Sequence, residues 1–344
     1  MAATWFKQTK SFCIGVVASG ASIAGLVYPI MLKFLISDIG FNNAQRAVAG
    51  LTSVLSIIVI FIARPNPATL PRKPSNWRGW FNVHIFWDRQ AFRDSAFCWQ
   101  TAAIAFLFWG FYPIFFNLEE WAAYNGLGYK DETPAGIASV TLGAKEVRND
   151  AIRVFYMLAI MNGTSTVGRM SSGLLSDKFG ALLVHCTVTF ISSILVLCVW
   201  TTTDTVPQAI GFVVVFGMFS GAVIGLPPAS MAWILDVNDP VAQQKLGQWV
   251  GMMYTMAAVP ALTGPLIAGE LITRFNNNYL TVQVWSGACL FVSACSMLVA
   301  LFYAERKRDK KWTTVPGRKF SEATSSMSFL TKSKSRAVSE KEDV

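Results

Sequence analysis

Apolar residues run along this chain in long blocks separated by short polar segments. Eight of these blocks approach or exceed the roughly 20 residues that a helix needs to cross about 30 Å of membrane hydrocarbon. They cover residues 12 to 36, 47 to 63, 95 to 117, 151 to 175, 181 to 201, 208 to 233, 247 to 270 and 281 to 304. The pattern predicts an all-α membrane protein with about eight transmembrane helices.

Composition and charge support this prediction and indicate an orientation. Hydrophobic residues make up 53% of the chain and charged residues 14%, whereas soluble proteins average about 25% charged residues. Lys and Arg are concentrated in alternate loops and after residue 304, and such loops face the cytosol. We therefore expect a multi-pass protein of the plasma membrane with both termini in the cytosol. The net charge of +9 follows from this asymmetry, so we expect contact with anionic lipid headgroups and no nucleic-acid partner.

The long connection at 64 to 94 divides the blocks into two and six. It is rich in Pro and Arg at its start and in Trp and Phe later, which predicts a cytosolic linker with an amphipathic interfacial helix. We expect two helices in 1 to 63 and a six-helix unit in 95 to 304. The polar composition of 305 to 344 predicts a disordered cytosolic tail.

The fourth block contains a charged residue, Arg169. Asp177 follows eight residues later at the polar end of the block, so Arg169 lies about 12 Å deeper along a helix. An arginine near the membrane centre costs at least about 2.5 to 3.5 kcal/mol, and such a residue usually faces a cavity or a partner. Arg169 therefore requires a functional or structural explanation.

Polar residues recur around Arg169 at spacings of three or four, which places them on one face of a helix. They are Asn162, Ser165, Arg169, Ser172 and Ser176. We interpret this stripe as lining a transport pathway, in which Asn162 and Ser165 accompany Arg169 and the arginine attracts an anionic substrate or holds a partner helix. The alternative is a structural arginine that bonds to helix-end carbonyls or extends to the cytosol.

The same block ends in the motif Gly173-x-Leu175-x-Asp177-Lys178-x-Gly180. It resembles the loop motif that joins paired helices on the cytosolic side of major facilitator transporters. The glycines let two helices approach closely, and Asp177 can sit at a neighbouring helix N-terminus, where the dipole favours an anion. We interpret Gly173, Asp177, Lys178 and Gly180 as a conformational latch. An ordinary tight loop with a solvated Asp-Lys pair is the alternative.

Two further segments narrow the resemblance within the major facilitator superfamily. Trp5-Phe6-Lys7-x-x-Lys10, followed by Tyr28-Pro29-Ile30, resembles the loop before the fifth helix and the helix itself in the monocarboxylate-transporter-like family, particularly its fungal members. Asn162-x-x-Ser165-x-x-Gly168-Arg169 resembles the eighth helix of that family.

This resemblance implies how the blocks correspond to the halves of the fold. Residues 1 to 63 would form the last two helices of the N-terminal half, and 95 to 304 would form the complete six-helix C-terminal half. The chain would then lack the first four helices and need them, or a partner chain, to enclose a site between two halves.

The chain departs from the family pattern at two places. Animal members have an aspartate where this chain has Ser165, which argues against an inherited proton-carboxylate mechanism. Fungal members often have Thr-Arg where this chain has Gln248-Trp249, so a cation expected near the cytosolic mouth is absent there.

The resemblance and the polar stripe together imply a secondary transporter of small organic anions or metabolites. Monocarboxylate-like transport and export of secondary metabolites, by alternating access, both fit. The alternative is a truncated, non-transporting sensor or scaffold, or a non-functional remnant.

Other chemistry has little support in the sequence. No paired intramembrane carboxylates or nucleophile and base at useful spacing indicate an enzyme. The six cysteines fall in predicted spans without a C-x-x-C pair, so we expect neither a disulfide framework nor a zinc site. His84 and His185, in or next to cytosolic loops, supply no metal ligand set, and we expect no metal or cofactor.

Overall fold

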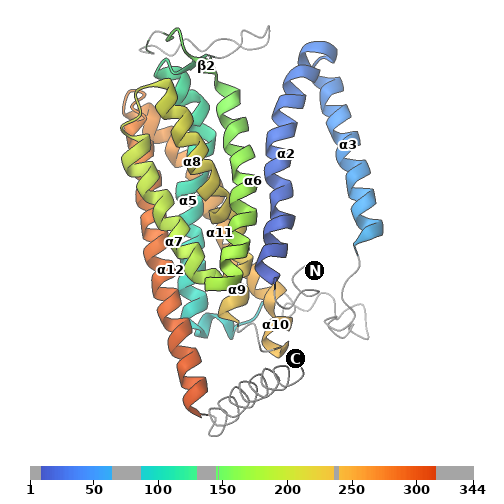
Figure 1. The fold of residues 1–344 in the computed structure, drawn as a ribbon, viewed down its shortest axis with the longest axis vertical. Coiled ribbons are helices and arrows are strands. Elements are labelled where there is room, and N and C mark those ends of the chain that lie inside the picture. The colour runs from blue at the N-terminus through green and yellow to red at the C-terminus, as the bar shows by residue number, and fades with distance from the viewer. Residues whose placement is uncertain (1–8, 64–86, 130–144, 146, 236–239, 315–344) are drawn as a thin grey trace, which may run out of the picture. The chain divides into compact units, whose positions relative to one another are not determined.

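The computed structural model describes residues 9–63, 87–129, 145, 147–235 and 240–314, and helices dominate these residues. The first two are α2 (Lys10–Ile39) and α3 (Phe41–Ile62). Gly40 alone separates them, with a φ of 76° that favours glycine. This single residue turns the chain back on itself, so α2 and α3 form an antiparallel pair (Figure 1).

The chain resumes with the short helix η3 (Ala91–Arg93) and the long helix α5 (Ser95–Tyr124). Asp94 caps α5, because its carboxylate accepts a hydrogen bond of 3.0 Å from the Ala96 backbone N–H. Two short parallel strands follow, β1 (Gly128–Tyr129) and β2 (Ile152–Arg153). They hold the start of α6 (Val154–Phe179) next to the end of α5.

Gly180 links α6 to α7 (Ala181–Ile194), which continues as the π-helix η4 (Leu195–Trp200). The next helix, α8 (Val206–Gly225), begins with a capping box between Thr205 and Gln208. The remaining helices are α9 (Pro227–Ile234), α10 (Pro240–Gln244), α11 (Leu246–Arg274) and α12 (Leu280–Thr314).

Seven of the described helices are long and apolar enough to cross a membrane. They correspond to seven of the eight predicted blocks, and they make this chain a multi-pass membrane protein. The remaining block, 151 to 175, corresponds to α6. With 26 residues α6 has the length of a span, but its polar stripe lowers its mean hydropathy. A helix of this composition needs protein neighbours to cover its polar face.

Element boundaries differ from the predicted blocks in places. The block at 208 to 233 is broken into α8 and α9, because Pro227 and Pro228 cannot continue the helical hydrogen bonds. Helix α12 continues past 304 to Thr314, through Glu, Arg and Lys residues that favour helix. The predicted interfacial helix falls mostly on 64 to 86, and most of the predicted disordered tail falls on 315 to 344; both stretches lie outside the described residues.

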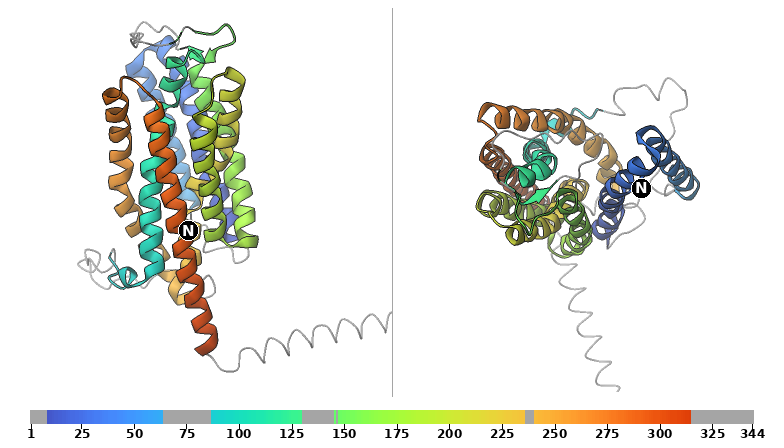
Figure 2. Two further views of the ribbon diagram at one scale, coloured as in Figure 1. Left: turned by 90° about the vertical axis from the view of Figure 1, so that its left-hand side faces the viewer. Right: turned by 90° about the horizontal axis from the view of Figure 1, so that it is seen from above.

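Helix α6 lies between α2 and α8, so neighbours on two sides cover it (Figure 1). Helix α5 packs against α11, and α7 packs against α8 and α9. Seen from above, α2 and α3 lie together on one side of the other helices (Figure 2). Along α3 only Ala44 is buried, whereas α5 buries large side chains such as Phe97, Ile104 and Leu107. Helix α6 therefore joins the α2–α3 pair to the remaining helices.

Candidate functional site

One face of α6 packs backbone to backbone against α8. A Cβ atom on Gly168 would overlap the carbonyl of Met218, and one on Gly221 would overlap the carbonyl of Ser165. Small residues permit such close approach between membrane helices. This face therefore has no space for another molecule, and the polar stripe faces α2 instead.

The stripe forms a series of polar contacts with α2, which we call the α2–α6 seam. The Asn162 side-chain amide donates to the carbonyl of Gly25 at 3.3 Å. One helical turn further along α6, the hydroxyls of Ser165 and Ser22 lie 2.6 Å apart. Both serines are buried, with 2% and 0% exposure. Because the helices run in opposite directions, each step forward on α6 meets an earlier residue on α2.

Arg169 continues the seam. Its Nη1 donates to the carbonyl of Ala18 on α2 at 2.5 Å, and its aliphatic stem lies beside Gly225 on α8. The Nε atom is buried without a hydrogen-bond partner, and among the described residues Arg169 makes no ion pair. A guanidinium has five N–H donors that match a carboxylate or phosphate. The arginine thus holds α2 through Nη1, while its buried Nε has no partner among the described residues.

Asp177 ends the seam at the first turn of α2. Its two carboxylate oxygens accept hydrogen bonds from the backbone N–H groups of Ser11 and Phe12, at 2.9 and 3.0 Å. These N–H groups have no partner within their own helix, and the helix dipole favours a negative charge there. A Cβ on Gly173 would lie 2.8 Å from the Phe12 Cα. Gly173 therefore gives the α2 backbone the space to reach Asp177.

The other two predicted latch residues lie at the turn after α6. Gly180 has a φ of 96°, and a Cβ there would lie 3.0 Å from the Trp233 indole nitrogen on α9. Lys178 is exposed, and within the described part of the chain it forms no ion pair. The structure thus brings Gly173 and Asp177 to α2, places Gly180 against α9, and leaves Lys178 at the surface.

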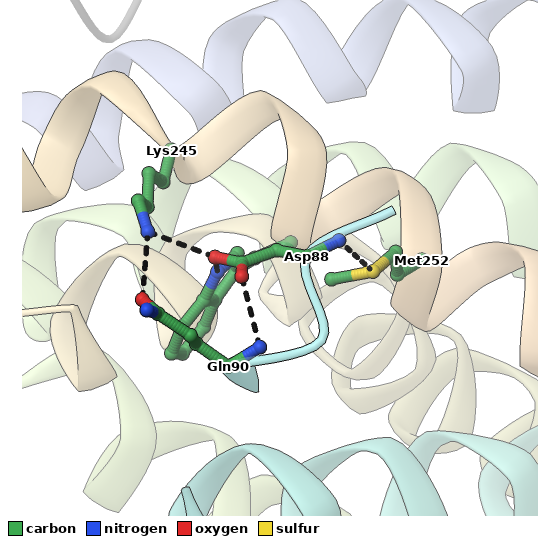
Figure 3. A network of polar contacts seen from close by, with 5 residues as sticks. Asp88, Gln90, Lys245 and Met252 are labelled. Carbon is green, nitrogen blue, oxygen red and sulfur yellow. Dashed lines mark hydrogen bonds and ion pairs between the residues drawn. The ribbon is translucent and has the colours of Figure 1, made fainter. Parts of the chain in front are cut away.

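A second polar cluster joins the residues before α5 to the start of α11 (Figure 3). One oxygen of the Asp88 carboxylate accepts hydrogen bonds from the Lys245 ammonium at 3.0 Å and from the Trp249 indole N–H at 3.2 Å. The Gln90 backbone N–H donates to its other oxygen at 2.9 Å. The backbone N–H of Asp88 points at the Met252 sulfur, 3.3 Å away. We call these residues the Asp88 cluster.

These contacts set the charge state of Asp88. Burial alone raises the pKa of this carboxyl, but the hydrogen bonds from Lys245, Gln90 and Trp249 outweigh burial and bring the pKa below its usual value. Asp88 is therefore ionised at neutral pH. Lys245 lies one turn before Gln248-Trp249, so it does not occupy the position at which the family resemblance led us to expect a cation.

Two functional candidates were not predicted from the sequence. Asp88 carries no local signal, because its partners in α11 lie more than 150 residues away. We expected His185 in or next to a cytosolic loop, but it lies within α7 and is completely buried. It contacts Ser230 on α9 and Val223 on α8. A histidine within an apolar block is a signal that could have directed attention to it.

Metal and disulfide chemistry has no basis in the described residues. They contain no group of His, Cys, Asp and Glu side chains that could hold a metal ion. All six cysteines are free thiols. The chemistry that the described site offers is hydrogen bonding and charge at the α2–α6 seam.

The chain resembles fungal transporters along most of its length. It is 28% identical to an MFS-type transporter of Gibberella moniliformis over 89% of this chain and 65% of the relative. It is 29% identical to the Aspyridones efflux protein of Emericella nidulans, over 84% of this chain and 51% of the relative. The Fujikurins efflux protein of Gibberella fujikuroi is 28% identical over 88% and 58%. The chain thus spans about half to two thirds of the length of these relatives.

The family model described as Major Facilitator Superfamily matches residues 1–237 and, in a second match, 156–338. These matches include α2 and α6 with the whole seam between them. With this coverage and the apolar helices of the fold, the chain belongs to the Major Facilitator Superfamily.

Proposed function

We propose that this chain is a secondary transporter that moves small metabolites across a membrane by alternating access, with export as its direction. Membership of the superfamily supports transport rather than catalysis. The names of two relatives, which are efflux proteins for aspyridones and fujikurins, support export of metabolites. Because the chain spans only part of these relatives, the activity has to be measured on this chain itself.

The observation that carries this proposal is the state of Arg169. Its guanidinium lies between two helices, bonds to the Ala18 carbonyl and has a buried Nε without a partner. A carbonyl is a weaker partner for a guanidinium than a carboxylate, which can accept two parallel hydrogen bonds. We infer that a small organic anion replaces Ala18 as the partner of Arg169 when α2 and α6 separate.

The seam contains the elements that such a movement needs. Asn162 and Ser165 make single hydrogen bonds to α2, and each can be exchanged for a bond to water or substrate at small net cost. Asn162, Ser165 and Arg169 would then line the opened pathway. Rocking of one group of helices against another is the general mechanism of transporters built from two repeats or bundles.

We propose that Asp177 is the latch of this movement. It binds the first turn of α2 while the seam is closed, with Gly173 allowing the contact and Gly180 forming the turn. Release of the α2 N-terminus would accompany opening. Lys178, exposed at the same turn, would contact anionic lipid headgroups and keep this end at the membrane surface.

The distribution of Lys and Arg supports an orientation in which the latch faces the cytosol. Lys178 follows Asp177 at the end of α6, and Lys245 directly precedes α11. Basic residues on the cytosolic side are the usual arrangement in membrane proteins. We therefore propose that both termini are cytosolic and that the protein lies in the plasma membrane.

Reconstitution of the full chain in proteoliposomes tests the proposal. Vesicles loaded with lactate, a small aliphatic anion, or with fluorescein, an aromatic one, are expected to lose at least one compound faster than protein-free vesicles. The R169A variant is expected to abolish the difference. A folded chain that neither binds nor releases either compound, nor any of a wider panel of metabolites, would instead support a sensor or scaffold.

A further inference from the structure

The break between α8 and α9 leaves a backbone carbonyl without its helical donor. In a continuous helix the carbonyl of Val223 accepts a hydrogen bond from the N–H of residue 227. Residue 227 is a proline, which has no N–H. Val223 is fully buried, so water cannot replace the lost donor. A buried acceptor without a partner is strongly unfavourable.

His185 on α7 supplies a donor at this position. Its Nε2 lies 3.1 Å from the Val223 carbonyl oxygen, and its Nδ1 lies 2.9 Å from the Ser230 hydroxyl on α9. A carbonyl only accepts, so Nε2 carries the hydrogen. The described residues place no carboxylate on His185, and a buried charge without a partner is unfavourable. The ring is therefore neutral, and Nδ1 accepts from Ser230.

One imidazole thus bonds to both sides of the break. We infer that His185 replaces the hydrogen bond that Pro227 removes and thereby fixes the angle between α8 and α9. His185 is in this sense a positioning residue: it acts through the backbone of α8 and the first turn of α9. The inference concerns the helix break and does not depend on which molecule the protein transports.

Helix α9 passes this constraint on to the turn after Asp177. The Ser230 hydroxyl gives its one hydrogen to His185 Nδ1, and its oxygen lies 3.4 Å from the carbonyl of Ala181, the first residue of α7, as a packing contact. Trp233 lies against Gly180, where a Cβ would come within 3.0 Å of the indole nitrogen. A change in the angle of α9 would therefore press on the turn that holds Asp177 against α2.

A double-mutant cycle between His185 and Pro227 tests the inference. H185L removes both hydrogen bonds, while its apolar side chain fills much of the volume of the imidazole. P227A restores a backbone N–H at the break. We expect H185L to lower the melting temperature of the purified full chain in detergent, and to lower it by less than half as much when P227A is present. H185Q is expected to retain most of the wild-type stability, because its amide can donate in place of Nε2.

The matched control lies on the same helix. Ser192 is buried and bonds to the carbonyl of Val188 in its own helix. The effect of S192A is therefore expected to be the same with and without P227A. Equal losses from H185L in the two backgrounds would overturn the inference.

A milder variant covers the case in which H185L does not fold. S230A keeps the bond from His185 to Val223 and removes the bond from His185 to α9, together with the Ser230 contact to the Ala181 carbonyl. We expect the backbone amides of α9 to exchange hydrogen about tenfold faster in S230A, the size expected for one lost buried hydrogen bond, while exchange in α8 stays unchanged. Unchanged exchange in α9 would show that His185 does not hold this helix.

Discussion

The Asp177 carboxylate at the end of α6 accepts a hydrogen bond from the backbone N–H of Phe12 at the start of α2. Its other oxygen binds the neighbouring N–H of Ser11. A charged side chain of one helix thus caps another helix that lies more than 160 residues away in the sequence. Because the contact uses backbone N–H groups, it depends on the position of α2 and not on the identity of its side chains.

Replacing Asp177 by Asn is expected to loosen this end of α2. The amide can accept only one of the two hydrogen bonds and lacks the charge that the helix dipole favours. Cys13 follows Phe12 and is half-buried, so its thiol reports the change. In a chain whose other cysteines are replaced by serine, D177N should make Cys13 react several-fold faster with a maleimide.

Lys178 provides the control for this experiment. It neighbours Asp177 but is exposed and has no ion pair among the described residues. The K178Q variant is expected to leave the rate of Cys13 labelling unchanged. Equal labelling in D177N and wild type would mean that Asp177 does not hold the start of α2.

The contact between Ser22 and Ser165 predicts that a disulfide at these two positions can lock the seam in its closed state. The two hydroxyl oxygens lie 2.6 Å apart, slightly more than the sulfur–sulfur distance of about 2.05 Å in a disulfide. In a background without other cysteines, S22C/S165C should form a disulfide on mild oxidation. If α2 and α6 separate during transport, the disulfide will stop flux in proteoliposomes and a reductant will restore it.

The single variants S22C and S165C are the controls, because they should transport equally with and without oxidant. Full flux through the cross-linked chain would show that the seam stays closed during transport. That result would remove the pathway role proposed for Asn162, Ser165 and Arg169.

If Arg169 binds an anion, the flux should depend on the planar guanidinium and not only on a positive charge at this position. R169K keeps the positive charge but lacks the planar set of donors that binds a carboxylate through two bonds. We expect R169A to abolish flux of an organic anion and R169K to reduce it by about tenfold, which corresponds to one lost charge-assisted hydrogen bond. Flux equal to wild type in both variants would assign Arg169 to holding α2 alone.

The sequence predicted most of the helical fold because long apolar blocks have few alternatives in a membrane. Seven blocks correspond to apolar helices, and the polar stripe identified α6 as the helix that needs protein neighbours. The break at Pro227 was harder to predict, since a proline can also lie within a continuous membrane helix, as Pro113 does in α5. At the break two prolines follow each other, at 227 and 228, whereas α5 contains one.

The candidate site could be predicted only in part. The spacing of Asn162, Ser165 and Arg169 on one face followed from helical periodicity, but periodicity does not say which helix covers that face. The partner α2 became visible only in the structure. The Asp88 cluster could not be predicted at all, since Asp88 and Lys245 come together through the packing of α5 against α11.

Glycine positions on α6 predict where side chains are tolerated. A Cβ on Gly168 would overlap the backbone of Met218, which cannot move aside without shifting α8. Gly163 lies on the same helix, and a Cβ there would have no other atom within 4 Å beyond its own stretch of helix. We expect G168A to lower the melting temperature strongly, by the several degrees typical of an overpacked core. G163A should be neutral or slightly stabilising, because alanine favours helix over glycine.

The Asp88 cluster predicts that the folded state loses stability as the pH falls into the acidic range. The pKa of Asp88 is below its usual value of 3.8, so the folded state favours the ionised carboxyl. Its contribution is fully present above pH 3.8 and is lost as the pH falls through the lower pKa of the folded state. Lys245 is 44% exposed, and solvent screens its charge, so we expect a contribution of about 1 kcal/mol or less.

The D88N variant tests this prediction, because asparagine does not titrate in this range. At pH 7 the wild type should melt a few degrees above D88N, and this difference should shrink as the pH falls below 3.8 and through the lower pKa of the folded carboxyl. K245M, which leaves the bonds from Trp249 and Gln90 in place, should lose less stability than D88N at pH 7. A difference that grows toward acid pH would mean that the folded state favours the protonated carboxyl and that the hydrogen bonds do not outweigh burial.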